Sequence, residues 1–191
     1  MLDQAMTDQA LWALGRGTGI TALLLLTISL AMGIATRSGR RVATLPRFAV
    51  ADVHRVAALA GTVLVAMHLA LLFFDPYAQL RLIDFMVPFL GAYRPLWLGL
   101  GTLAFDVLVA VILSSLLRHR IGVRAFRVVH WATYALWPLA LAHALGNGTD
   151  VGHPWFLVLA GCCALGVAAA LVWRLRSDFV EYADTRASGG R

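Results

Sequence analysis

The chain has 191 residues, of which 60% are hydrophobic and only 14% are charged, and its mean hydropathy is +0.77. In soluble domains about a quarter of the residues are charged, so this composition excludes an ordinary soluble protein and indicates one that lies in a lipid bilayer. The net charge of +6 comes from arginines in short connections between apolar runs, which excludes nucleic-acid binding and fits contacts with lipid headgroups.

Five apolar segments follow one another along the chain, each near the roughly 20 residues that span a bilayer. They cover residues 17–36, 53–74, 95–117, 128–146 and 155–173. The sequence therefore predicts an all-α, polytopic membrane bundle of five transmembrane helices. The stretch before the first segment is acidic, unlike the basic start of a signal peptide, so we expect that segment to be retained. We expect one transmembrane domain over residues 1–191, with its core at about 12–175 and no soluble flavin or nicotinamide domain.

The connection 75–94, DPYAQLRLIDFMVPFLGAYR, has an intermediate character. It is too short and too charged for another span, yet it is too apolar for a free loop. We expect an interfacial or re-entrant segment that covers the outer end of the bundle.

The arginines are distributed unevenly between the two sides of the predicted bundle. Most fall in the 37–55 and 118–127 regions and in the C-terminal tail, whereas Arg16, Arg81 and Arg94 fall on the other side. The positive-inside rule therefore predicts an N-terminus outside and a C-terminus in the cytoplasm, which fits an odd number of spans.

Four histidines lie near the ends of two spans: His54 and His68 on the second, and His130 and His143 on the fourth. These two helices run in the same direction, so His54 can face His130 at the inner level and His68 can face His143 at the outer level. Separations of 14 and 13 residues put the two levels ~20 Å apart. Residues 14 positions apart point to nearly the same side of a helix, whereas residues 13 positions apart fall about 140° short of full turns. We therefore expect Pro138 to kink or re-phase the fourth helix.

Two facing imidazoles at one level are the axial ligand set of a six-coordinate haem b. Two such levels would hold two haems stacked across the membrane, and coordination would satisfy rings that are otherwise costly in hydrocarbon. Four independent hydrogen-bonded histidines are the alternative. A zinc or copper site is disfavoured, because the levels lie ~20 Å apart and no Cys, Asp or Glu clusters with them.

The segments HRVAALAGTVLVAMH and FRVVHWATYALWPLALAH resemble the ferric reductase-like transmembrane domain. That superfamily includes NADPH oxidases, yeast-type ferric reductases and the haem subunit of a periplasmic methionine sulfoxide reductase system. The segments DPYAQLRLIDFMVPFLGAYRPLW and HALGNGTD are similar to stand-alone actinobacterial members. The resemblance implies that His54, His68, His130 and His143 ligate the iron of two b-type haems, and that electrons move outward from a cytoplasmic donor.

Many relatives carry a flavin and nicotinamide domain, which we do not find in this sequence. The resemblance thus implies an oxidoreductase component of a bacterial cell membrane that receives electrons from a separate donor, either a flavoprotein or a quinol. Ferric iron, oxygen and a partner protein remain open as acceptors. Two other functions also remain open: a quinol-linked cytochrome b subunit of a larger complex, and a haem-free transporter or scaffold.

Five further residues are weaker candidates. Arg55 and Arg127 flank the inner histidines and Arg16 opens the first span, so each is a candidate contact of a haem propionate, with headgroup anchoring as the alternative. Asp106 lies near the middle of the third span, where a carboxylate either tunes a ligand histidine, bonds another helix or lines a transport pathway. Trp137 either bridges the two haems or simply packs.

Overall fold

The computed structural model describes residues 2–39, 42, 44–177, 179 and 181. Within these residues the structure is all-α, as predicted. Its helices are α1 (Leu2–Ser38), α2 (Arg47–Phe74), α3 (Pro95–Leu116), α4 (Arg118–Trp131), α5 (Thr133–Asn147) and α6 (Pro154–Leu175). Two short 3-10 helices, η1 (Leu82–Phe85) and η2 (Thr149–Gly152), lie in the connections. Arg40, Arg41, Arg186 and Arg191, which belong to the predicted arginine-rich side, lie outside the described residues.

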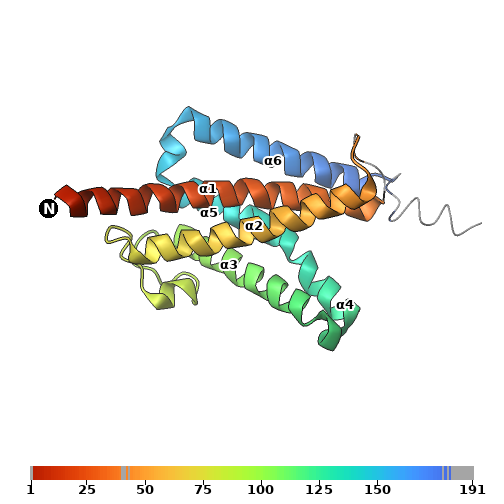
Figure 1. Cartoon of the computed structure of the whole chain (residues 1–191), viewed down its shortest axis with the longest axis horizontal. Coiled ribbons are helices and arrows are strands. Elements are labelled where there is room, and N and C mark those ends of the chain that lie inside the picture. Colours follow the sequence, from red (N-terminus) through yellow and green to blue (C-terminus); the bar gives the residue numbers. More distant parts are fainter. Residues whose placement is uncertain (1, 40–41, 43, 178, 180, 182–191) are drawn as a thin grey trace, which may run out of the picture.

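The long helices run side by side, so that the connections gather at two ends of the bundle (Figure 1). The ends of α1 and α6, the start of α2 and all of α4 lie at one end, which we call the arginine-rich end. The N-terminus and the 75–94 connection lie at the opposite end. Helix α1 packs against α2, α5 and α6, and α3 packs against α5 and α4. Between the described parts of α2 and of α3, α4 and α5 there are few direct contacts.

Four helices are long and apolar enough to cross a membrane: the Met6–Ser38 part of α1, α2, α3 and α6. The chain is therefore a multi-pass membrane protein, and four of the five predicted segments form candidate spans. The remaining one, residues 128–146, is divided between α4 and α5. Helix α5 has 15 residues, which rise only ~22 Å, so a crossing of the ~30 Å hydrocarbon layer here needs both helices.

The interruption between α4 and α5 falls at Ala132. The backbone N–H of Ala132 bonds to the carbonyls of Val129 and His130, and the Thr133 hydroxyl donates to the carbonyl of His130 at 2.8 Å. Short-range bonds of this kind replace the regular bonds of an α-helix. Pro138 lies inside α5, and a kink or re-phasing of the helix by this proline stays a prediction.

The 75–94 connection is fixed to α3 by buried polar groups. The carboxylate of Asp84 accepts a hydrogen bond from the backbone N–H of Arg81 at 2.9 Å and from its guanidinium at 3.0 Å. The Arg81 guanidinium holds the pKa of the Asp84 carboxyl below its usual range. The Thr102 hydroxyl of α3 donates to the Asp84 carbonyl at 2.7 Å. The large apolar side chains exposed here include Tyr77, Leu82, Met86, Leu90 and Tyr93. An anchored segment with outward apolar side chains fits the predicted interfacial position rather than a span.

Trp137 lies in the core where α5 meets α1 and α6. Its side chain is 6% exposed and packs with Cys163 and Val167 of α6. Its indole N–H donates to the Thr27 hydroxyl of α1 at 2.8 Å, inside the apolar core. This arrangement favours the packing role for Trp137, and electron transfer through the ring stays a prediction.

The Thr27→Val variant tests the importance of that hydrogen bond. Valine has nearly the shape of threonine but leaves the Trp137 N–H buried and unpaired, which costs about 1–3 kcal/mol. We expect a lower thermal unfolding midpoint in detergent. Thr21→Val is the matched control, because the exposed Thr21 hydroxyl bonds only to Gly17 of its own helix, and an equal loss in both variants would contradict the role of the Trp137 bond.

Candidate functional site: two histidine pairs

The structure brings together the four histidines in the two pairs expected from the sequence. The ring centroids of His54 and His130 lie 6.3 Å apart, and those of His68 and His143 lie 6.5 Å apart. The ring planes are nearly perpendicular in both pairs, at 82° and 80°. In each pair, one ring comes from α2 and the other from α4 or α5, so the pairs connect two parts of the bundle that otherwise have few direct contacts.

Three of the four rings make the same hydrogen bond. The Nδ1–H of His68 donates to the carbonyl of Gly15 at 2.7 Å. The Nδ1–H of His54 donates to the carbonyl of Ser29, and that of His143 to the carbonyl of Trp97, both at 2.8 Å. Because Nδ1 carries the proton in each case, Nε2 keeps its lone pair, which is the state of a metal-ligating imidazole.

A glycine lies four residues after each of these carbonyls and makes room for the ring. A Cβ added to Gly101 would lie 2.5 Å from Nδ1 of His143, and one added to Gly19 would lie 2.8 Å from Nδ1 of His68. At Gly33 the Cβ would lie 3.1 Å from Cε1 of His54. The absence of a side chain therefore lets each imidazole lie against the neighbouring helix and reach its carbonyl.

His130 is the exception. Its Nδ1 is buried and has no hydrogen-bond partner among the described residues, and its ring lies beside Phe126 with centroids 5.3 Å apart. The pair at the arginine-rich end therefore contains one ring whose orientation depends on packing alone, whereas both rings of the other pair are held by carbonyls.

The spacing within each pair fits a metal ion between the rings. Bonds of about 1.33 Å place a nitrogen about 1.1 Å from the centre of a five-membered ring, and a histidine nitrogen lies about 2.0–2.1 Å from a metal such as zinc. An ion in line between two imidazoles thus requires centroids about 6.2–6.4 Å apart, close to the observed values of 6.3 and 6.5 Å.

The donor set also indicates which kind of metal group fits. In the described part of the chain, no cluster of three or more His, Cys, Asp or Glu side chains could hold a metal ion. Two nitrogens are too few for a tetrahedral protein-bound zinc site. They are sufficient as the two axial ligands of a metal whose other ligands come from a macrocycle.

Arg16 lies next to the carbonyl that holds His68 and forms an ion pair with Asp150 of η2. The distance from Nη2 of Arg16 to Oδ1 of Asp150 is 2.8 Å, and the Asp150 side chain is 7% exposed. The Nε of Arg16 is buried and has no acceptor among the described residues. Arg16 thus retains one donor for an anionic group at this end.

The other weaker candidates lie apart from the rings or lack a described partner. Arg55 is 72% exposed and lies 3.7 Å from Asp52, and Arg127 is exposed on α4. No hydrogen bond from the described residues reaches the half-buried carboxylate of Asp106. Three ligand candidates are instead held by backbone carbonyls, and a role for Asp106 stays a prediction.

The glycines and carbonyls were not found by the sequence analysis. One signal was present in the sequence, because Gly19 and Gly33 are separated by 14 residues, the same interval as His54 and His68. In two antiparallel helices, these equal intervals place Gly19 beside His68 and Gly33 beside His54. Recognising this needed the knowledge that α1 pairs with α2.

The Gly101→Ala variant tests the role of the open helix surface. The added methyl group would displace the His143 ring, so we expect a lower unfolding midpoint and loss of the Nδ1 hydrogen bond, measured by thermal denaturation and by nitrogen-15 NMR of labelled histidine. Gly17→Ala is the control, because a Cβ there meets nothing within 4 Å and alanine stabilises a helix by roughly 0.5–1 kcal/mol. Equal effects of both substitutions would contradict the role of Gly101.

Comparison with known proteins gives one match. Residues 18–141 match the family model described as the ferric reductase like transmembrane component. The match includes His54, His68 and His130 and ends two residues before His143. No curated protein and no solved structure matches the chain.

The family match covers more than half of the chain but distinguishes no lineage, so the actinobacterial subtype stays a prediction. Members of this family typically bind haem, and their fold implies membrane electron transfer. The chain belongs to the ferric reductase-like transmembrane component family.

Proposed function

We propose that the chain carries electrons across the membrane through two b-type haems, one held by His54 and His130 and the other by His68 and His143. The observation that carries this proposal is the ring spacing of 6.3 and 6.5 Å, which suits an iron between the rings. The carbonyl bonds of three rings support it, because they leave Nε2 free to coordinate.

The chain's own residues would hold the two groups and set their properties. When bound, each haem supplies one-electron chemistry between ferric and ferrous iron. The carbonyls of Gly15, Ser29 and Trp97 strengthen three histidines as donors. The buried Nε of Arg16 is available to a carboxylate at the opposite end. Arg55 and Arg127 are exposed and remain candidates for contacts at the arginine-rich end.

The distribution of charge predicts the orientation of the chain, and the resemblance to the family implies that electrons move outward from a cytoplasmic donor. The arginine-rich end belongs on the cytoplasmic side by the positive-inside rule, with α4 and α5 crossing together as the fifth span. A separate flavoprotein or a quinol would then supply electrons to the His54 and His130 pair. The His68 and His143 pair would pass them to an outer acceptor such as ferric iron, oxygen or a partner protein.

Difference spectra of single variants test the proposal. The dithionite-reduced minus oxidised spectrum of the purified protein should show b-type absorption with two haems per chain. His54→Ala and His68→Ala should each lose one haem, because each removes a ligand from a different pair. His153→Ala is the control, since His153 is exposed in the connection before α6. Unchanged spectra in the first two variants would refute the assignment of ligands.

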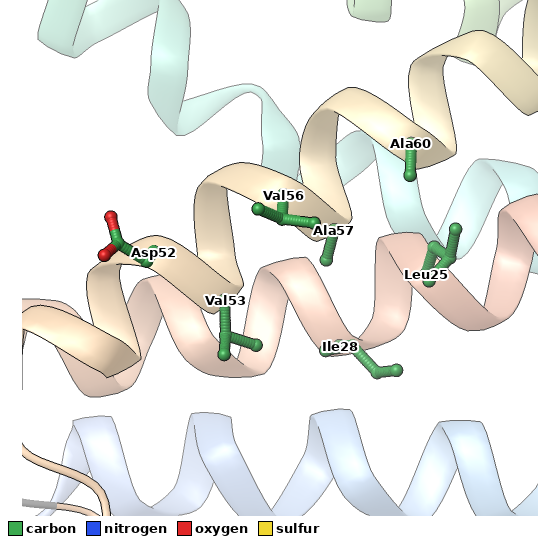
Figure 2. Close-up of a pocket in the computed structure, with 7 residues that line it drawn as sticks. All are labelled: Leu25, Ile28, Asp52, Val53, Val56, Ala57 and Ala60. Atoms are coloured by element: carbon green, nitrogen blue, oxygen red, sulfur yellow. The ribbon is translucent and has the colours of Figure 1, made fainter.

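A groove between α1 and α2 favours a quinol as the donor, which is the second candidate function. The groove has a volume of about 380 Å³ and is lined by apolar side chains, with Asp52 at one end (Figure 2). Its lining consists of Leu25, Ile28, Asp52, Val53, Val56, Ala57 and Ala60. The exposed lining surface of the groove is wholly apolar, which suits the isoprenoid tail of a quinol.

Filling the groove tests this second candidate. Ala60→Phe should raise the KM for decylubiquinol several-fold, measured as the rate of reduction of the protein, because the larger ring occupies the space of the tail. Leu59→Phe is the control, since Leu59 is 62% exposed and does not line the groove. Equal KM values for both variants and the native chain would exclude the groove as a quinol site and leave a soluble donor.

A further inference from the structure

Two arginines, Arg37 and Arg174, meet at the arginine-rich end of the bundle. Arg37 lies in the last turn of α1 and Arg174 lies in the last turn of α6, where a positive charge is favoured by the helix dipole. The Nη2 atoms of both side chains lie 3.2 Å from the same oxygen, Oε1 of Glu181. A residue of the C-terminal segment therefore bridges the ends of the first and last helices.

This cluster has more donors than acceptors. Two guanidinium groups face one carboxylate, and within the described part of the chain both contact its Oε1. The Nη1 of Arg174 is buried and has no acceptor among the described residues. A single planar carboxylate leaves this donor unused, whereas a phosphate group with several oxygens can accept from all three nitrogens. The cluster also retains a net positive charge.

The surroundings of Arg174 resemble a lipid-facing interface. Its guanidinium carbon lies 6.0 Å from the centre of the Trp131 ring and 5.5 Å from that of Phe179. Trp131 is 56% exposed. Aromatic rings are concentrated at the depth of lipid headgroups, and basic pockets between the cytoplasmic ends of membrane helices bind anionic headgroups.

We propose that Arg37 and Arg174 form a phosphate-binding site, occupied by the headgroup of an anionic phospholipid and by Glu181 when no phosphate is bound. None of the four paired histidines belongs to this site. Burial would raise the pKa of the Glu181 carboxyl, but the charges and hydrogen bonds of Arg37 and Arg174 outweigh it and lower that pKa. Glu181 is therefore a charged competitor at neutral pH.

Lipid retention measured by native mass spectrometry tests the site. The full chain is purified in a neutral detergent and offered dioleoylphosphatidylglycerol or dioleoylglycerol, which lacks the phosphate. We expect retention of the first only. Arg174→Gln should weaken it about tenfold, the effect of losing one charge-assisted contact. Glu181→Gln should strengthen it, because the competing charge is removed. Arg124→Gln is the matched control, since it removes the same charge from an exposed position on α4.

The outcomes separate the sources of the phosphate. If inorganic phosphate displaces the lipid, or stabilises the chain and this effect is lost in Arg174→Gln, the site serves a soluble phosphate. Equal retention by Arg174→Gln and Arg124→Gln would overturn the proposal. Should Arg174→Gln fail to fold, Glu181→Gln decides, and unchanged retention in that variant would overturn the proposal as well.

Discussion

The rest of this structure depends on one kind of hydrogen bond. In it, a histidine Nδ1–H donates to a helix carbonyl that a glycine leaves accessible. It occurs with His68 on Gly15, His54 on Ser29 and His143 on Trp97. Each bond fixes the tautomer and the plane of the ring at once. Because the carbonyls belong to rigid membrane helices, the rings need no further polar support inside the bilayer.

The interaction explains how the helices are arranged. Helix α1 provides the carbonyls for both histidines of α2, so the close packing of α1 and α2 sets both levels together. Helix α3 does the same for His143 of α5. Between α2 and the path of α4 and α5, direct contacts are few among the described residues, and the ring pairs are where these parts approach. Such an arrangement suits a bundle that holds flat groups between its halves.

The sequence predicted the positions of the histidines and their pairing because helical rise and direction follow from the chain alone. His54 and His68 needed only the period of a helix, and the pairing with His130 and His143 needed only parallel directions. The carbonyl partners could not be predicted, because they depend on which helices are neighbours and how they are rotated. The ion pair of Arg16 and Asp150 joins residues separated by 134 positions, and no local sequence pattern indicates it.

Local departures from regular helix were also hard to predict. Proline is the strongest signal of a helix break. The backbone nevertheless leaves helical geometry at Gly122 inside α4, where φ is 82°, and α4 and α5 divide at Ala132, where the Thr133 hydroxyl takes part. This interruption follows His130, the one ring without a carbonyl partner. The two ends of the proposed electron path therefore differ, with two carbonyl-held rings at one end and one at the other.

The central claim is that each pair holds a haem iron between its two imidazoles. The electron paramagnetic resonance spectrum of the oxidised, purified chain tests it most directly. Ring planes at 82° and 80° predict low-spin ferric signals with the strong anisotropy that perpendicular axial imidazoles produce. A high-spin ferric signal, or no haem signal at all, would contradict the account.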